Sequence, residues 1–321
     1  MVIAFGTRAP SQAAMNSLRK ARTDAHMLRE ACMASEKPAS AIMLDAHIAH
    51  QWPVRDQFGR GTCVAFATLA AVELSSALGT DMLPERLSEQ FLHDVMVQKH
   101  PLPAAVAEDL PEGGVLLRQA WHALREHGVI GAEKYPYKSH IFSAVESASL
   151  PPEDLARAAQ NRIIPLAYGT IGKVEHMECG GFDEIEPNGQ TAARILGFLQ
   201  MNRPVAMGVP LFQHPSGLSN WTLPSAMSSG IVLCPQDANA PVLEGPRSDG
   251  HVVCVTGFLP DPNEPMGGWF VFRNSWGLEF ASHATLPSAG ITARRRGYGV
   301  ISATHVNAYC WEYLVPGPLH V

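Results

Sequence analysis

The spacing of apolar residues changes along the chain, and this change constrains the fold more than any other feature. Before residue 204, apolar side chains recur every three or four positions, which is typical of helices that bury one face. After it, short β-rich runs are separated by Gly, Pro and Asn turns. The pattern predicts helices at residues 11–36, 63–78, 115–127 and 191–202, further helices beginning at 88 and 151, and strands at 205–209, 251–258, 269–274 and 298–302. A helical part followed by a β-rich part predicts an α+β fold class.

Three long connections interrupt the β-rich part of the chain. Residues 213–249, 260–268 and 278–297 are rich in Pro, Gly, Ser and Ala. Connections of this length and composition are usually insertions on the surface of a domain and often carry function. We therefore expect them on the rim of a sheet or barrel.

The composition excludes several classes of protein. Of the 321 residues, 46% are hydrophobic and 17% are charged, as in ordinary globular proteins. The formal net charge is −6, which provides no field to attract nucleic acid or anionic lipid. No stretch reaches the roughly 18–20 apolar residues that span a bilayer, and the N-terminus lacks the basic and apolar regions of a secretory signal. We expect no nucleic-acid or membrane partner.

The cysteines are scattered and contain no C-x-x-C pair, which argues against both a disulfide framework and a cysteine-rich zinc site. They are Cys32, Cys63, Cys179, Cys234, Cys254 and Cys310. A reducing, cytoplasmic location follows, with signal-independent delivery into another cell or compartment left open. The only metal-like spacing is His47-x-x-His50, which supplies two ligands without a third. We therefore expect no metal site.

Cys63 lies where a turn-rich loop meets a predicted helix. Residues 52–61 are rich in turn formers, and Thr62 is the expected N-cap of the helix. The helix dipole and the unpaired N–H groups at this end favour a thiolate. A single cysteine at such a position can equally be a small buried side chain, so other motifs must decide.

Those motifs resemble the papain-like cysteine peptidases, the family of papain and the lysosomal cathepsins. The segment QWPVRDQFGRGTCVAFATLAAVE resembles the family's active-site segment, and Gln57 stands six residues before Cys63. Downstream, SDGHVVCVTGF resembles the family's histidine strand and GGWFVFRNSWG its asparagine strand. The likeness runs from about Trp52 to Ser302, with smaller matches at residues 87–90, 113–114, 135–137 and 297–299.

The resemblance implies a papain-like bilobal fold with an active-site cleft between the lobes. A helical left lobe would cover residues 53–158, and a β-barrel-like right lobe would cover 159–321 plus 41–52. Residues 41–321 would then form the catalytic domain. Residues 1–40 would form an N-terminal amphipathic helix and linker, either a short prosegment lying across the cleft until it is removed or a segment docked permanently on the body or a partner.

The resemblance also implies roles for four residues. Cys63 would be the nucleophile, poised as a thiolate beside an imidazolium, and His251 the general acid and base. Asn274 would orient the imidazole, and Gln57 would donate to the oxyanion together with the Cys63 N–H. The implied activity is that of a cysteine endopeptidase acting on peptide or protein substrates, with no metal or organic cofactor.

Four further residues are implied to line the substrate site, namely Gly113, Gly114, Gly250 and Trp276, the last also shielding the bond between His251 and Asn274. The chain departs from the family at Arg60, which stands where a disulfide cysteine is usual. Two alternatives stay open. The same thioester chemistry would serve an acyl transferase, meaning a transpeptidase or deamidase, and a noncatalytic peptide-binding protein could keep the same cleft.

Overall fold

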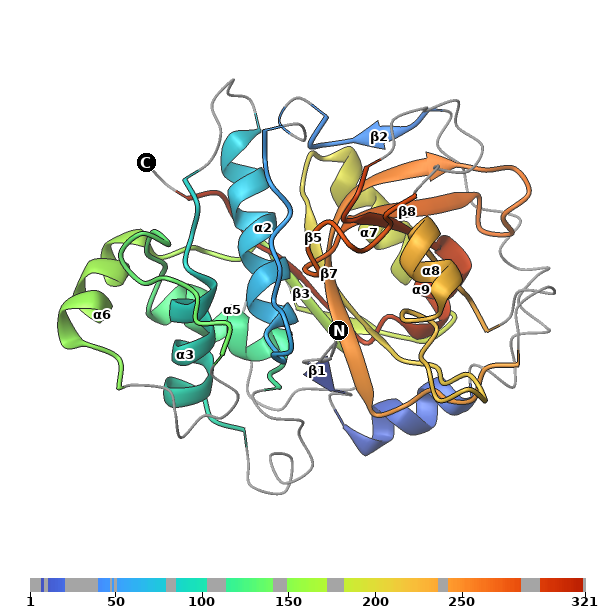
Figure 1. Cartoon of the computed structure of the whole chain (residues 1–321), viewed down its shortest axis with the longest axis horizontal. Helices are drawn as coiled ribbons and strands as arrows, with labels where there is room; N and C mark the ends of the chain where they lie inside the picture. The colour runs from blue at the N-terminus through green and yellow to red at the C-terminus, as the bar shows by residue number, and fades with distance from the viewer. Residues whose placement is uncertain are drawn as a thin grey trace.

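The computed structural model of the chain is a mixed helix and sheet structure (Figure 1). It describes residues 7–8, 11–20, 40–46, 48, 51–78, 85–102, 114–140, 149–171, 182–235, 242–283 and 295–319. Within these ranges, every helix is too short or too polar to span a bilayer.

The helix α2 (Cys63–Ala77) lies at the centre of the molecule, with a group of helices on one side and the sheet on the other (Figure 1). The helices beside it are α3 (Glu89–Lys99), α5 (Leu117–Glu126) and α6 (Pro152–Ala158), the last followed by a 3-10 turn at Ala159–Asn161. The helices on the sheet side are α7 (Thr191–Gln200), α8 (Pro224–Ser229) and α9 (Ala303–Tyr309). Because α2 packs against α3 and α5 as well as against the sheet, it is buried around nearly its whole circumference.

The strands form one sheet of ten strands in the order β4-β3-β10-β5-β7-β8-β9-β6, with β1 and β2 pairing with β7 outside this path. Their bounds are β1 Thr7–Arg8, β2 Ile42–Met43, β3 Ala167–Ile171, β4 Phe182–Ile185, β5 Val205–Pro210, β6 Ile231–Val232, β7 Asp249–Pro260, β8 Gly268–Arg273, β9 Tyr298–Ser302 and β10 Glu312–Val315. The predicted barrel-like lobe is therefore corrected to an open sheet. A barrel needs a ladder between its end strands, whereas β4 pairs with β3 and β6 with β9.

Most predicted elements are present, and their ends follow local signals. The Ser88 hydroxyl accepts a hydrogen bond from the Phe91 N–H at 3.0 Å and so caps α3. Gly128, with φ of 78°, follows the end of α5. The predicted N-terminal helix is present at residues 12–20, and the remainder of its range lies outside the described residues.

Several elements were not predicted, namely β1, β2, β3, β4, β6, β10, α8 and α9. The strand β3 contains Gly169, against which the Tyr313 ring of β10 packs so closely that an added Cβ would lie 2.4 Å from it. The strand β10 contains the fully buried Glu312. A glycine and a carboxylate inside short strands hide the apolar alternation that a sequence pattern needs.

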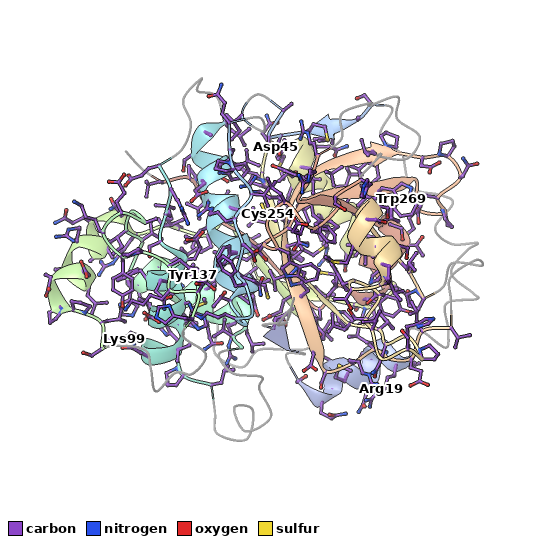
Figure 2. All side chains as sticks on the ribbon, viewed as in Figure 1. Arg19, Asp45, Lys99, Tyr137, Cys254 and Trp269 are labelled. Carbon is purple, nitrogen blue, oxygen red and sulfur yellow. The ribbon has the colours of Figure 1, made fainter. Side chains whose placement is uncertain are left out.

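The interior is continuous from the central helix into the sheet. Figure 2 shows Cys254 near the middle of the molecule and Tyr137 among the helices on the other side of α2. Buried residues of α2 and β7, including Leu69, Val72 and Val253, belong to one apolar cluster. This shared core holds the start of α2 in place against the sheet.

Candidate active site

Two loops, one preceding α2 and one following β8, are joined by backbone hydrogen bonds. The Gln57 N–H donates to the Ser275 carbonyl at 2.8 Å, and the Gly277 N–H donates to the Arg55 carbonyl at 3.0 Å. Asp56 and Trp276 form the β-bridge between these bonds. The segment that carries Gln57 is therefore fixed directly to the segment that carries Asn274, although more than two hundred residues separate them in the sequence.

Side-chain hydrogen bonds of Gln57 reinforce this connection between the two loops. The Ser275 hydroxyl donates to the Gln57 Oε1 at 2.5 Å, and the Gln57 Nε2 donates to the Arg60 carbonyl at 2.6 Å. The Gln57 carboxamide is fully buried and held at both ends, so its orientation is set before any substrate binds.

His251 and Asn274 lie together, as the resemblance implies. His251 is the third residue of β7, and its Nε2 lies 2.7 Å from the Asn274 Oδ1, which also accepts from the Ser275 N–H at 2.8 Å. The Trp276 ring stacks on the imidazole with centroids 4.5 Å apart and an interplanar angle of 28°. Sequence reasoning missed Trp221, whose ring meets the imidazole edge to face at 4.9 Å.

Cys63 is the first residue of α2 and is fully buried. The Thr62 hydroxyl does not cap α2 as predicted, because it is hydrogen-bonded to the Tyr137 hydroxyl at 2.8 Å. Tyr137 in turn donates to the Gln57 carbonyl at 2.9 Å. One tyrosine thus braces both sides of the loop that leads to Cys63.

The first turns of α2 face the strand that carries His251. Ala67 and Ala70 of α2 line a cavity of about 10 Å³ together with Val252, Asn274 and other residues of the two loops. Contacts between α2 and β7 elsewhere along the two elements support the same packing.

Buried charges hold the loop in front of α2. Arg55 forms ion pairs with Glu73 of α2 and Glu89 of α3. Burial raises the pKa of Glu73, and the nearby Arg55 opposes this shift. On the sheet side, Arg273 of β8 donates to the Trp52 carbonyl at 3.0 Å, and its guanidinium carbon lies 3.9 Å from the centroid of the Trp52 ring.

Arg60 occupies the position where the family usually has a disulfide cysteine, and it makes polar contacts there. One guanidinium nitrogen donates to the Gln90 Oε1 at 2.7 Å and to the Lys138 carbonyl at 2.8 Å. The guanidinium also lies over the Tyr137 ring, 5.0 Å from its centroid. The arginine therefore ties the loop to α3 and to the segment after α5 without a covalent bond.

The site is closed to solvent. Cys63, Gln57 and His251 are each 0% exposed. Burial lowers the pKa of His251 to about 4, against the smaller opposing effect of the Asn274 hydrogen bond. The buried ring therefore favours the neutral imidazole, whereas a thiolate–imidazolium pair needs solvent or charge near the ring.

The N-terminal strand β1 pairs with the beginning of β7, next to His251. Thr7 pairs with Gly250 and Arg8 pairs with Asp249, so β1 occupies the part of β7 that immediately precedes His251. Gly250 is buried, and an added Cβ would lie 2.1 Å from the Trp311 ring. Close packing against this ring therefore explains why a glycine stands at this position. Gly114 is also buried, whereas Gly113 lies outside the described residues.

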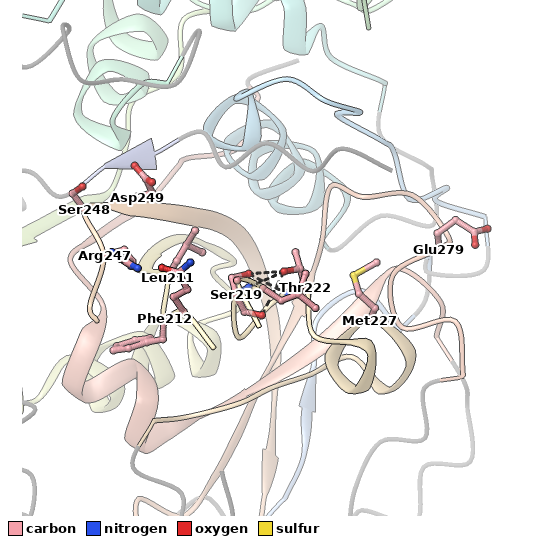
Figure 3. A pocket seen from close by; sticks show the side chains of 12 residues that line it. Leu211, Phe212, Ser219, Thr222, Met227, Arg247, Ser248, Asp249 and Glu279 are labelled. Carbon is pink, nitrogen blue, oxygen red and sulfur yellow. Dashed lines mark hydrogen bonds between the residues drawn. The ribbon is translucent and has the colours of Figure 1, made fainter. Parts of the chain in front are cut away.

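A large pocket opens beside the same end of β7 (Figure 3). Its volume is about 910 Å³. Ser248 and Asp249 lie at one side, with Met227 and Glu279 at the other. Much of the wall comes from the 213–249 connection, which contains α8 and β6 and so is more structured than a loop insertion.

Some of the cysteines and histidines considered for disulfide or metal chemistry lie outside the described residues. Cys63, Cys234, Cys254 and Cys310 are buried and remain thiols. Burial raises the pKa of Cys254 and of Cys310 well above the usual range of a thiol. His47 and His50 lie outside the described residues.

Comparisons with known proteins agree with this arrangement. A model of the papain family cysteine proteases matches residues 44–179. Among solved structures, the fold is similar to xylellain, a cysteine protease from Xylella fastidiosa, with a TM-score of 0.54 and 17% identity over 91% of this chain and 90% of that one. It is similar to a digestive procathepsin L2 proteinase from the Tenebrio molitor larval midgut, with a TM-score of 0.53 and 17% identity over 88% of this chain and 69% of that one. A search of curated protein sequences found no match. The resemblance to the papain family of cysteine proteases that the sequence predicts is therefore confirmed, in the family match for residues 44–179 and in the papain-like fold of the chain.

Proposed function

We propose that this chain is a cysteine endopeptidase that hydrolyses peptide bonds through a thioester on Cys63. The observation that carries the proposal is the connected set of His251, Asn274, Trp276, Ser275 and Gln57 beside the helix that begins at Cys63. A merely structural histidine would not need both a carboxamide partner and a tryptophan stacked on its ring.

The proposed reaction has two halves. The His251 Nδ1 takes the proton of the Cys63 thiol, and the sulfur attacks the carbonyl carbon of the scissile bond. The same proton passes to the leaving amine, which leaves a thioester. A water molecule then gives a proton to His251 and attacks the thioester, which releases the carboxylic acid and restores the thiol.

Two neighbours would set the geometry of these steps. With the His251 Nε2 held by Asn274, the ring presents its other nitrogen to the proton transfer. The Gln57 Nε2 and the Cys63 N–H would donate to the oxyanion, which in comparable enzymes contributes about 3–4 kcal/mol per donor. The Gln57 amide would have to release the Arg60 carbonyl or share its second proton.

Substrate can reach Cys63 only if the closed site opens. The pairing of β1 with β7 at Gly250 makes the N-terminal segment the described element best placed to block it. We therefore favour the blocking segment over the permanently docked one. Sequencing the N-terminus of purified protein over time separates the two: activity that rises as residues are lost supports blocking, and full activity with an intact N-terminus contradicts it.

The pocket next to β7 is the proposed site for a substrate side chain. Its wall includes Asp249, two residues from His251, and Arg247. Both charges are present in one wall, so the pocket would suit a polar side chain better than a purely apolar one.

The deciding experiment compares the full chain with its Cys63→Ala variant on a mixed peptide library. Cleavage should fall by at least about a thousandfold in the variant, because the nucleophile is lost. A matched Cys234→Ala variant should keep its activity. Equal cleavage by parent and Cys63→Ala protein would refute the proposal.

The same experiment separates the alternatives. Mass spectrometry of the products distinguishes free carboxylates from ligated peptides or deamidated side chains, which would indicate an acyl transferase. Peptide binding without any product in the parent would indicate a noncatalytic protein.

A further inference from the structure

Three histidines and one glutamate gather where α3 and α5 end, away from the candidate active site. His100 follows the last residue of α3, and His127 follows the last residue of α5. Glu126 is the last residue of α5, and His122 lies one turn before it. Figure 2 marks the place by Lys99, the residue before His100.

The side chains converge on one point. One ligand atom each of His100, Glu126 and His127 lie within 4.8 Å of one another. The His100 ring is 5.3 Å from the His127 ring and 5.3 Å from the His122 ring. The His122 Nδ1 is hydrogen-bonded to the Glu126 Oε1 at 2.9 Å, and this bond restricts the orientation of the carboxylate.

One atom of this cluster has no ordinary partner within the described part of the chain. The His100 Nε2 is buried and makes no hydrogen bond there, and its nearest charged group is the Glu126 Oε2 at 3.9 Å. A buried ring nitrogen without a hydrogen bond is unfavourable unless something else binds it.

The electrostatic surroundings suit a cation. Both helices end at the cluster, so the negative ends of their dipoles lie near it.

We propose that His100, Glu126 and His127 bind a zinc ion that clips the end of α3 to the end of α5. Two imidazoles and a carboxylate are a common zinc donor set, with a water molecule completing four-coordination. Zinc bonds of about 2.0–2.1 Å place the ligand atoms roughly 3.3 Å apart. The Glu126 side chain is 53% exposed, so it can move to bring its oxygen atom to that distance from the two imidazole nitrogens.

The clip would stabilise the helical side of the molecule. The segment between the two helices includes residues 103–113, so a metal bond between His100 and His127 closes a long loop. His122 would act as a positioning residue, because it orients the carboxylate without itself binding the ion.

The test is zinc titration of the full chain against a competing chromophoric chelator. All proteins carry Cys63→Ala, so that the candidate active-site thiol cannot bind the ion. The parent should bind one zinc ion more tightly than the His100→Gln, His127→Gln and Glu126→Gln variants, each by at least about tenfold. His122→Gln should weaken binding less. His283→Gln, at an exposed histidine outside the cluster, should change nothing.

Two further measurements keep the result interpretable. Zinc should raise the melting temperature of the parent and leave that of the His100→Gln/His127→Gln double variant unchanged. Cobalt should give the visible absorption bands of a four-coordinate ion in the parent alone. Glu126→Gln changes an exposed side chain and is expected to fold. Unchanged zinc affinity in folded Glu126→Gln and His127→Gln proteins would overturn the proposal.

Discussion

Ser275 and Asn274 are neighbours in the sequence, yet each holds a different member of the candidate active site. Asn274 accepts from the His251 ring, and the Ser275 hydroxyl holds the Gln57 carboxamide. The residue types and their spacing in Asn-Ser-Trp predict the partner of the asparagine. They do not predict the partner of the serine, because Gln57 reaches it only after the two loops have paired.

Removing the Ser275 hydroxyl should therefore affect catalysis as well as stability. We expect kcat of Ser275→Ala to fall about tenfold with little change in KM, since a misoriented oxyanion donor weakens transition-state binding. Steady-state kinetics on one peptide substrate measures both constants. Ser282→Ala is the matched control, and a parental kcat in Ser275→Ala would contradict this role for the serine.

Arg60 should matter for stability because its guanidinium is buried. Arg60→Ala leaves the Lys138 carbonyl without its arginine donor and the Gln90 Oε1 with only the Lys138 N–H, and we expect a loss of about 2–3 kcal/mol in the free energy of unfolding. Urea denaturation measures this loss. The exposed Arg86, 4.0 Å from Glu89, is the control, and Arg86→Ala should change the free energy by less than about 1 kcal/mol. Equal effects of the two substitutions would exclude the bracing role of Arg60.

At the scale of elements, the pairing of β1 with β7 joins the N-terminus to the strand that begins the candidate site. A two-residue strand has no sequence signature, because neither alternation nor length distinguishes it from a loop. The helix at 12–20 was predicted from apolar residues at helical spacing that begin at Leu18, and Leu18 is fully buried in the structure.

Breaking this strand should expose Cys63. Proline at positions 7 and 8 removes two backbone N–H groups and disfavours pairing, so the Thr7→Pro/Arg8→Pro double variant should react with iodoacetamide at least several times faster at Cys63. Peptide mapping by mass spectrometry gives the rate at this residue. Gln12→Ala, an exposed change on the adjoining helix, should keep the parental rate. If the proline variant does the same, β1 does not control access.

At the scale of the whole molecule, Glu312 connects the sheet to the helices beside α2. Its Oε2 accepts from the Leu117 N–H at the start of α5 at 3.1 Å, and the Tyr168 hydroxyl donates to its other oxygen. Burial raises the pKa of Glu312 to about 7, against the smaller effects of these hydrogen bonds. The carboxyl is fully buried between two parts of the chain that are 195 residues apart.

This carboxyl should make stability depend on pH. Between pH 4.5 and 7, the folded protein retains a proton that the unfolded chain releases, so this contribution is complete below pH 4.5 and is lost as the pH rises through 7. We expect Glu312→Gln to remove on the order of 2–3 kcal/mol of that decline. Urea denaturation of both proteins at pH 5 and pH 8 measures it. An identical pH difference in the two proteins would show that Glu312 does not titrate in this range.

The sequence by itself determined the family resemblance, the helical and β-rich parts and the residues proposed for catalysis, because each depends on local periodicity or on short motifs. Only the tertiary structure decided that the sheet stays open, that Trp221 from a long connection packs on His251, and that β1 pairs with β7 just before His251. These features depend on contacts between residues far apart in the chain. Such contacts form when packing and strand pairing bring distant segments together, and local periodicity carries no record of them.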